Sequence, residues 1–328
     1  MAQDRRTFLA AWSAMTLGVA AMSRVARADD PDMVTLDWAY YNPLSLILRE
    51  RQILEQRLAP RNISVQWVQS LGSNKAIEFL NAGSLDFGST AGAAALLGRV
   101  AGAPIRTTYV YSKPEWTALV TRPDTGIKAV TDLKGRSIAV TKGTDPYVFL
   151  LRSLEGAGLA QGDVSLVLLQ HDQGRLALER GDVDAWAGLD PMMAQSELTA
   201  GSILFHRDPA LNSFGVLNVR EEFLADHPDL VREVLAAYEE ARGIATSDPS
   251  GLQALLAKAA KLPPEVAARQ LERTGLNESW PTDIHVETIR EAGLALQTAG
   301  VIAADVNVPA TTAALIDPKA IQALVGQG

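Results

Sequence analysis

Short apolar runs alternate with segments of helical periodicity over residues 33–219, and this alternation limits the possible folds more than any other feature. Strands that alternate with helices along a chain are typical of α/β proteins, whose sheets are covered by helices. The first part of this region predicts strands at Val34–Ala39, Ile63–Val68 and Ile105–Val110, and helices at Leu44–Leu58, Asn74–Asn81 and Ala91–Val100. The sequence therefore predicts an α/β fold.

The same alternation begins again after an apolar segment at Trp116–Thr121, which we expect to cross into a second lobe. Strands are predicted at Ser137–Val140, Ser165–Leu169 and Ala185–Gly188, and helices at Pro146–Ala157, Gly174–Arg180 and Pro191–Thr199. A strand at Gly215–Val219 then returns the chain to the first lobe, and the remainder is almost wholly helical, with segments at Asp229–Ser247, Gly251–Ala260, Pro264–Arg273 and Val286–Ala299. We predict two lobes, residues 29–118 plus 218–328 and residues 119–217, with a ligand cleft between them.

The first 28 residues have the pattern of an export signal. Paired arginines at Arg5-Arg6 precede an apolar run from Leu9 to Met22, and Ala26-Arg27-Ala28 offers small residues where a signal peptidase cleaves. This apolar run is too short for a membrane span, and the arginine pair followed by Phe-Leu is similar to the twin-arginine signal. We expect a mature, soluble periplasmic protein that begins at Asp29.

Removing residues 1–28 lowers Lys+Arg from 30 to 26 and Asp+Glu from 38 to 37, so the net charge changes from −8 to −11. An acidic chain without a basic cluster argues against nucleic acid or an anionic membrane surface as a partner. No later stretch approaches 18 consecutive apolar residues, so no stable membrane anchor is expected.

Cysteine is absent, which excludes disulfides, thiolate nucleophiles, cysteine-based zinc sites and a lipid anchor on an N-terminal cysteine. The four histidines, His171, His206, His227 and His285, are far apart without ligand-like spacing. Surface or loop positions are therefore the prediction for them, and neither a metal nor a cofactor is expected. We expect the product to be a monomer.

Four predicted loops carry Gly, Ser, Thr or Asn immediately before a helix, where backbone N–H groups lack intrahelical partners and the helix dipole is positive. They are Tyr40-Tyr41-Asn42-Pro43, Ser70-Leu71-Gly72-Ser73-Asn74, Gly88-Ser89-Thr90-Ala91 and Thr141-Lys142-Gly143-Thr144-Asp145-Pro146. Several such helix starts in one cleft would bind a small anion. Ordinary helix capping is the alternative for each loop, and the recurrence in both halves of the chain favours a binding role.

Aromatic and acidic side chains also fall at predicted strand ends or helix starts. The aromatic residues are Tyr40, Tyr41, Trp116, Tyr147, Trp186 and Phe214, of which Trp186 is the best candidate for a wall of the ligand site. Core packing is the alternative for such residues. Glu115 and Asp190 would either repel a plain anion or pair with a cationic group of a zwitterionic ligand, and helix capping is a further alternative for Asp190.

Three segments carry a family resemblance that spans nearly all of the mature chain: Phe79-Leu80-Asn81-Ala82-Gly83-Ser84-Leu85-Asp86-Phe87-Gly88-Ser89-Thr90, Asp132-Leu133-Lys134-Gly135-Arg136-Ser137-Ile138-Ala139-Val140 and Gly181-Asp182-Val183-Asp184-Ala185-Trp186. In this order they resemble the aliphatic sulfonate-binding proteins of ABC importers, within the nitrate, taurine and sulfonate receptor family. Asp145 departs from the serine-rich loop that relatives often have at its position.

This resemblance implies a two-lobed type II periplasmic binding fold that closes on its ligand and presents it to a membrane permease. It also implies ligand contacts from the loops at Tyr41-Asn42, Gly72-Ser73-Asn74, Ser89-Thr90, Gly143-Thr144 and Trp186 to Asp190. With the neighbouring aromatic and acidic residues, the candidate ligand-binding set is Tyr41, Asn42, Gly72, Ser73, Asn74, Ser89, Thr90, Glu115, Trp116, Gly143, Thr144, Asp145, Tyr147, Trp186 and Asp190.

The function predicted from these features is a non-enzymatic receptor for a small organosulfonate. Taurine, nitrate or another small anion or zwitterion remains open as the ligand. An enzyme on the same scaffold would need acid–base groups, for which Glu115, Asp145, Asp190 and His171 are the candidates. No G-x-S-x-G, H-E-x-x-H or P-loop arrangement occurs in the sequence. A sensory protein without transport is the third alternative.

Overall fold

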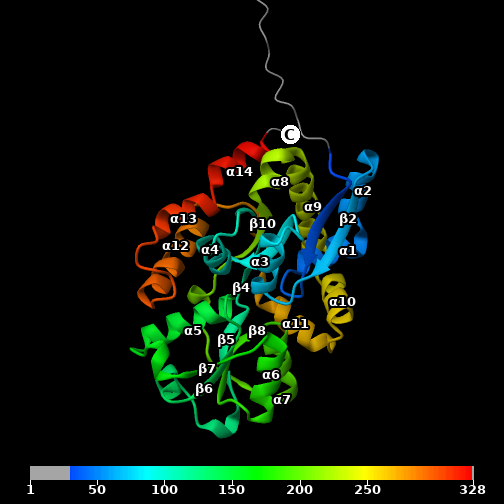
Figure 1. Ribbon diagram of the computed structural model, residues 1–328. Helices are drawn as coiled ribbons and strands as arrows, with labels where there is room; N and C mark the ends of the chain where they lie inside the picture. Colours follow the sequence, from blue (N-terminus) through cyan, green and yellow to red (C-terminus); the bar gives the residue numbers. More distant parts are fainter. Residues whose placement is uncertain (1–29, 327–328) are drawn as a thin grey trace, which may run out of the picture.

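Two β-sheets, one above the other in Figure 1, form the centres of two lobes in the computed structural model. The structure describes residues 30–326. The predicted export signal, residues 1–28, lies outside the described residues.

Lobe I is built on a sheet whose strand order is β11-β4-β10-β3-β1-β2, six strands among the described residues. Its strands are β1 (Met33–Trp38), β2 (Ser64–Gln69), β3 (Phe87–Ala91), β4 (Ile105–Pro114), β10 (Gly215–Arg220) and β11 (Thr274–Gly275). Strands β2, β1 and β3 are parallel, and β10 runs antiparallel between β3 and β4.

Lobe II is built on a sheet with the order β7-β6-β8-β5-β9, five strands within the described part of the chain. They are β5 (Thr117–Thr121), β6 (Ser137–Val140), β7 (Ser165–Leu168), β8 (Ala185–Leu189) and β9 (Ile203–His206). Strands β7, β6 and β8 are parallel, and β5 runs antiparallel between β8 and β9.

The two sheets therefore share one topology, in which the antiparallel strand arrives from the other lobe. An aspartate before the third parallel strand fixes the first strand in both lobes. Asp86 accepts hydrogen bonds from the backbone and hydroxyl of Thr35, each at 2.8 Å. Asp184 accepts the corresponding bonds from Ser137 at 2.9 and 2.7 Å. Asp86 and Asp184, which both belong to the resemblance segments, thus have a structural role.

Helices connect the strands and cover both sheets (Figure 1). In lobe I they are α1 (Pro43–Arg51), α2 (Ile53–Leu58), α3 (Ser73–Asn81) and α4 (Gly92–Val100), and in lobe II α5 (Asp145–Gly156), α6 (His171–Arg180) and α7 (Met192–Ala200). After β10 follow α8 (Glu221–Asp226), α9 (Pro228–Ser247), α10 (Pro249–Ala260), α11 (Pro264–Glu272), α12 (Asp283–Thr298), α13 (Val308–Leu315) and α14 (Pro318–Val325). Short 3-10 turns lie at Ala59–Arg61, Pro123–Thr125, Val130–Leu133, Gln161–Asp163 and Pro209–Leu211.

The chain changes sheets twice, between Pro114 and Thr117 and again between His206 and Gly215. The helices after β10 return to lobe I, and α9 packs against α1, α2 and β4. Helices also connect the lobes at two places outside the crossings: α5 packs against α4 and α12, and α7 packs against α11. The domain limits at residues 119 and 218 remain a prediction.

One apolar core continues from lobe I into lobe II. Leu96 of α4 and Ile289 of α12 belong to the same buried cluster as Leu150 of α5 and Ile138 of β6. A second cluster fills lobe I between the sheet, α1 and α9, and a smaller one in lobe II surrounds Trp186. Because burial of apolar surface is the main favourable term in folding, the α5 side of the lobe interface is the more firmly joined one.

Three sequence predictions of local structure were wrong. The segment Gly88–Ala91 is not a loop but part of the buried strand β3, whose pairing with β1 and β10 outweighs the weak strand propensity of its small residues. The predicted helix Leu44–Leu58 is two helices, because Gln52 takes a left-handed conformation with φ 52°. Helix α6 begins three residues earlier than predicted, at His171.

Gly174 of α6 is required by close packing against lobe II's buried tryptophan. A Cβ there would lie 2.8 Å from Trp186 Nε1, whereas Gly243, in the exposed middle of α9, has no atom within 4 Å of that position. Gly174→Ala is therefore expected to lower the free energy of unfolding by about 1–2 kcal/mol. Gly243→Ala should raise it by about 0.5–1 kcal/mol, because alanine favours the helix. Urea unfolding of both variants measures this, and equal effects would contradict the packing argument.

Candidate functional site

The starts of α3 in lobe I and α6 in lobe II meet across the gap between the lobes. A Cβ at Gly72, the residue before α3, would lie 3.1 Å from His171 Nε2, at the first position of α6. Neither helix has a side-chain cap at its start. Their first-turn N–H groups therefore remain available to a ligand with negative charge.

The loop that follows β6 lies beside the starts of α3 and α6 and completes the site between the lobes. A Cβ at Gly143 would lie 3.7 Å from the side chain of Asn74. In the same loop, Thr141 Oγ1 lies 3.2 Å from His171 Nδ1, and Thr144 Oγ1 donates a 2.6 Å hydrogen bond to the carbonyl of Thr141. We call the three segments, residues 70–74, 141–144 and 170–173, the interlobe site. It contains the predicted residues Gly72, Ser73, Asn74, Gly143 and Thr144.

Polar atoms without partners gather at the interlobe site. Within the described chain, Asn74 Oδ1, Gln170 Oε1 and His171 Nε2 are buried and have no hydrogen-bond partner. Unpaired buried polar atoms are costly, so their concentration at one place indicates a ligand that would satisfy some of them.

His171 corrects the prediction that the histidines lie on the surface or in loops. It is 1% exposed, and burial lowers its pKa to about 3. His285, which was also expected at the surface, is buried against Phe214 and bonded to Glu278 at 2.7 Å. His171 of α6 and His285 of α12 both lie on the buried face of their helix. The sequence around a single histidine does not reveal which face of a helix it occupies.

The predicted pair Asn42 and Ser89 lies in the core of lobe I. Ser89 donates its backbone and hydroxyl hydrogens to Asp37 Oδ1, each at 2.8 Å. Asn42 donates to Ser89 Oγ at 2.7 Å and to Tyr238 at 3.1 Å, while its oxygen caps α1 through Ser45. This network holds the ends of β1 and β3 together, and capping is the role that the structure gives to Asn42.

The amides of Ala91, Gly92 and Ala93, which were expected to be unpaired, have partners within the protein. Ala91 N–H donates to Ser73 Oγ at 3.0 Å, and Gly92 N–H donates to the carbonyl of Phe214 at 2.9 Å. Thr90 Oγ1 accepts from Asn218 at 2.8 Å. The prediction of an open helix start at α4 was wrong.

The predicted residues Trp116 and Asp145 take part in a group of hydrogen bonds that joins the two crossing segments. Asp145 Oδ2 accepts from Trp116 Nε1 at 2.8 Å and from the Ser213 amide at 2.9 Å, and its Oδ1 accepts from Ser213 Oγ at 2.6 Å. The carboxylate is 1% exposed, and burial raises its pKa. Glu115 pairs with Arg207 of the other crossing segment at 2.7 and 2.9 Å. Tyr41 stacks edge-on against Trp116 at 6.0 Å.

The remaining predicted residues belong to lobe II, and Asp190 among them also contacts lobe I. Trp186 is 1% exposed in the core cluster, and the Tyr147 hydroxyl donates to Gln161 at 3.2 Å. Asp190 accepts from the Ala194 amide at 2.8 Å and pairs with Arg273 of lobe I at 3.4 Å. Burial raises the pKa of Asp190 to about 7, although the charge of Arg273 opposes that rise.

An ionic contact with Arg273 at its centre joins the lobes on the side of α7 and α11. Arg273 also pairs with Glu197 of α7, which in turn binds Arg269 of α11 at 3.0 Å. The lobes thus meet through apolar packing on one side and ion pairs on the other. The interlobe site lies between α3 and α6, which take part in neither contact.

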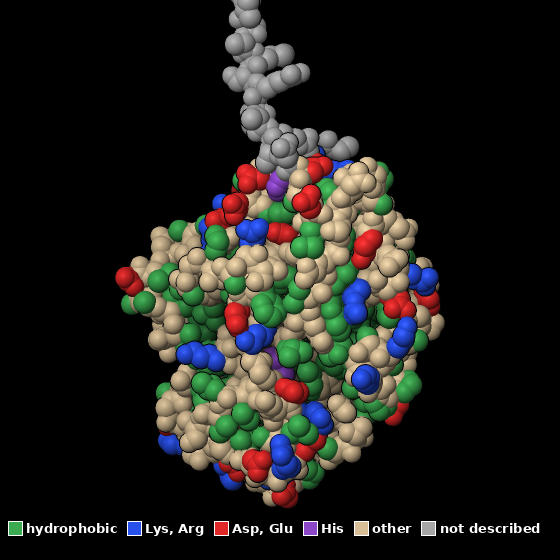
Figure 2. All heavy atoms as spheres, turned by 45° about the vertical axis from the view of Figure 1, so that its right-hand side comes forward, with side chains coloured by type: hydrophobic (Ala, Val, Ile, Leu, Met, Phe, Trp, Pro, Cys, Tyr) green, Lys and Arg blue, Asp and Glu red, His purple; other side chains and the backbone are tan. Residues whose placement is uncertain are grey.

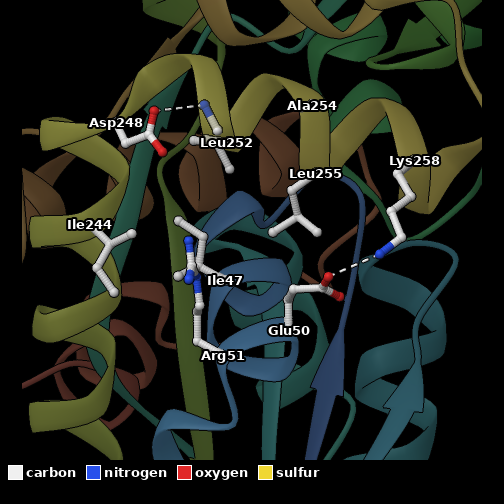
Figure 3. A pocket seen from close by; sticks show the side chains of 10 residues that line it. Ile47, Glu50, Arg51, Ile244, Asp248, Leu252, Ala254, Leu255 and Lys258 are labelled. Carbon is white, nitrogen blue, oxygen red and sulfur yellow. Dashed lines mark hydrogen bonds and ion pairs between the residues drawn. The ribbon is translucent and has the colours of Figure 1, made fainter.

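The pocket in Figure 3 lies elsewhere, between α1, α9 and α10 of lobe I. It has a volume of about 440 Å³, and Lys258 pairs with Glu50 at 2.9 Å across its edge. Because it involves lobe I alone, a ligand there would not join the lobes. Figure 2 shows basic and acidic side chains interspersed over one face, whose outline is indented on the left where the lobes meet.

Within residues 30–326, no helix combines the length and apolarity needed to cross a membrane. Nor does this part of the chain bring together three or more His, Cys, Asp or Glu side chains in a group that could hold a metal ion.

The candidate binding set predicted from the sequence lacks His171, Gln170, Ser70 and Asp37. A comparison of the two halves of the chain would have found two of them. Gln170-His171 follows β7 and precedes α6, just as Ser70 to Asn74 follows β2 and precedes α3. Asp37 lies within a strand and gives no such signal.

Comparisons with known proteins support the family resemblance. A family model described as NMT1/THI5 like matches residues 59–251. A protein of Escherichia coli (strain K12) named as an aliphatic sulfonates-binding protein is 31% identical over 277 residues, which cover 84% of this chain and 85% of that protein.

Solved structures share the fold. The alkanesulfonate-binding protein SsuA from Xanthomonas axonopodis pv. citri, bound to MOPS, has a TM-score of 0.80 at 24% identity and covers 87% of this chain and 99% of its own. The periplasmic aliphatic sulphonate binding protein SsuA from Escherichia coli has a TM-score of 0.74 at 26% identity, with coverages of 85% and 91%. The predicted two-lobed periplasmic binding fold is confirmed.

Asp37 generates a prediction of pH dependence. The carboxyl group is fully buried, and burial raises its pKa to about 7, which is above the value of about 3.9 expected in the unfolded chain. The folded state therefore binds the proton more tightly, and stability falls as the pH rises between these two values. Asp37→Asn should remove this loss, so that its stability relative to the wild type increases by a few kcal/mol from pH 4 to pH 7. Urea unfolding across that range measures it, and a constant difference would contradict the raised pKa.

Proposed function

The chain belongs to the NMT1/THI5-like family, and we propose that it is a periplasmic solute-binding protein that delivers an aliphatic sulfonate to the permease of an ABC importer. The proposed ligand is an alkanesulfonate or a related organosulfonate. The proposal includes export by the signal in residues 1–28, action as a monomer and no catalytic step.

The meeting of the α3 and α6 starts is the observation that carries the proposal. Two uncapped helix starts from different lobes direct N–H groups to one place, where their dipoles favour a negatively charged group. A sulfonate has three oxygen acceptors and a permanent negative charge, so several amides can bind it at once without a basic side chain. A ligand bound here contacts both lobes.

Closure of the lobes follows from this placement. Because a ligand that touches both lobes binds the closed arrangement more tightly, it shifts the population towards that arrangement. The crossing segments, Glu115–Trp116 and Arg207–Phe214, are the positions where the backbone can absorb the motion. A permease that recognises the closed form would then distinguish the loaded protein from the empty one.

A calorimetric titration tests the ligand class. We expect heat of binding with alkanesulfonates of two to four carbons, and weaker binding of sulfate and nitrate, which lack an organic tail. A neutral sugar serves as the control ligand. If the sulfonates give no signal and a neutral solute binds, the proposed function is wrong.

Gly72→Ala tests the location of the site. The added Cβ would lie 2.8 Å from Asn74 Oδ1 and 3.1 Å from His171 Nε2, so it would hold the lobes apart. Gly72 has φ 166°, an extended conformation that alanine adopts without strain. We expect sulfonate affinity to fall at least tenfold, by roughly 1.4 kcal/mol or more, with little change in the stability of the ligand-free protein.

Gly162→Ala in lobe II is the matched control, because its Cβ position has no atom within 4 Å. It should leave affinity unchanged. Equal affinities of the two variants would place the ligand somewhere other than the interlobe site.

A further inference from the structure

His171 presents a buried nitrogen with no partner to the interlobe site. Its side chain is 1% exposed, and Nε2 lies 3.1 Å from the Cβ position of Gly72 in the opposite lobe. Nε2 has no hydrogen-bond partner among the described residues. The other ring nitrogen, Nδ1, contacts Thr141 Oγ1 at 3.2 Å.

The hydrogen bonds of Thr141 decide which ring nitrogen carries the proton. A threonine hydroxyl has one hydrogen to donate, and Thr141 donates it to the carbonyl of Leu169 at 2.7 Å. Its oxygen can therefore only accept from His171, so Nδ1 carries the hydrogen and Nε2 has the free lone pair. The position of His171 at the start of α6 also disfavours a charged imidazolium, because that end of the helix is positive.

A second acceptor faces the same point. Asn74 Oδ1 lies 2.8 Å from the Cβ position of Gly72 and is likewise buried without a partner. The amide of Asn74 can rotate to present its NH2 group, whereas the contact of His171 with Thr141 fixes the orientation of its ring. The interlobe site thus offers helix-start donors beside an acceptor that a sulfonate oxygen cannot satisfy.

We propose that the ligand carries a hydrogen-bond donor, N–H or O–H, in addition to its sulfonate, and that His171 Nε2 accepts from this donor. The ligand class is then an amino- or hydroxyalkanesulfonate. This inference rests on the proposed function and specifies its substrate. His171 acts as a specificity-determining residue, and a plain alkanesulfonate leaves its nitrogen unpaired.

Matched ligands test the proposal by calorimetry on the mature protein. Ethanesulfonate and propanesulfonate are compared with their terminal amino and hydroxyl derivatives. At least one donor-bearing derivative should bind about tenfold to a hundredfold more tightly than its parent, the usual effect of pairing a buried polar group. If every parent binds as tightly as its derivatives, the proposal is overturned and the sulfonate-receptor function stands. If no sulfonate binds, the receptor function itself fails.

Two variants separate the acceptor from the rest of the ring. His171→Asn keeps an N–H group near the position of Nδ1, where it can still bind Thr141, but removes the acceptor at Nε2. His171→Gln places an amide oxygen near the position of Nε2. We expect the affinity ratio of derivative to parent to approach one in His171→Asn and to be retained in part by His171→Gln. A general folding defect would weaken all ligands alike and leave this ratio unchanged.

Nitrogen-15 NMR of labelled histidine provides a readout that is independent of affinity. The ligand-free protein should show His171 in the Nδ1–H form at neutral pH, and binding of the preferred derivative should shift the Nε2 resonance. An Nε2–H form would overturn the proposal, as would loss of the ligand preference in Asn74→Ala but not in His171→Asn.

Discussion

The arrangement of the two lobes depends on the hydrogen bonds that the buried Asp145 side chain accepts. It lies at the start of α5 and accepts hydrogen bonds from both crossing segments, through Trp116 and Ser213. Ser213 Oγ in turn accepts from the Ala93 amide at the start of α4 in lobe I, at 3.2 Å. One acidic side chain thereby links both crossing segments to α5 of lobe II and, through Ser213, to α4 of lobe I. Both oxygens of Asp145 accept hydrogen bonds within the protein, so the side chain is not available to a ligand.

The repeated topology explains why the starts of α3 and α6 face each other. Helix α3 follows the edge strand β2 in lobe I, and α6 follows the edge strand β7 in lobe II. The two helices occupy equivalent positions, so when the lobes face each other, their starts face each other too. Asn74 Oδ1 and His171 Nε2, the unpaired side-chain atoms at these two starts, both lie close to the Cβ position of Gly72.

Sequence periodicity predicted most of the elements, because apolar spacing directly reflects which face is buried. It failed at β3, where Phe87-Gly88-Ser89-Thr90-Ala91 has the small polar residues of a loop but is paired on both sides. The candidate site was predicted in part. The loops at Gly72 and Gly143 lie together, whereas Asn42, Ser89 and Asp145 use their polar atoms within the fold. Side chains that cap a helix and side chains that bind a ligand have the same composition, so the sequence alone does not separate them.

The sequence by itself determined the α/β class, the two series of strands and helices, and the family, since these depend on local periodicity and on motif residues such as Asp86 and Asp184. Only the tertiary structure decided which polar groups remain unpaired. Pairing depends on neighbours far apart in the chain: Asp145 is satisfied by Ser213, 68 residues away, while His171 Nε2 faces Gly72 and finds no partner. Which polar atoms stay unpaired is therefore set by long-range contacts that the local sequence pattern does not encode.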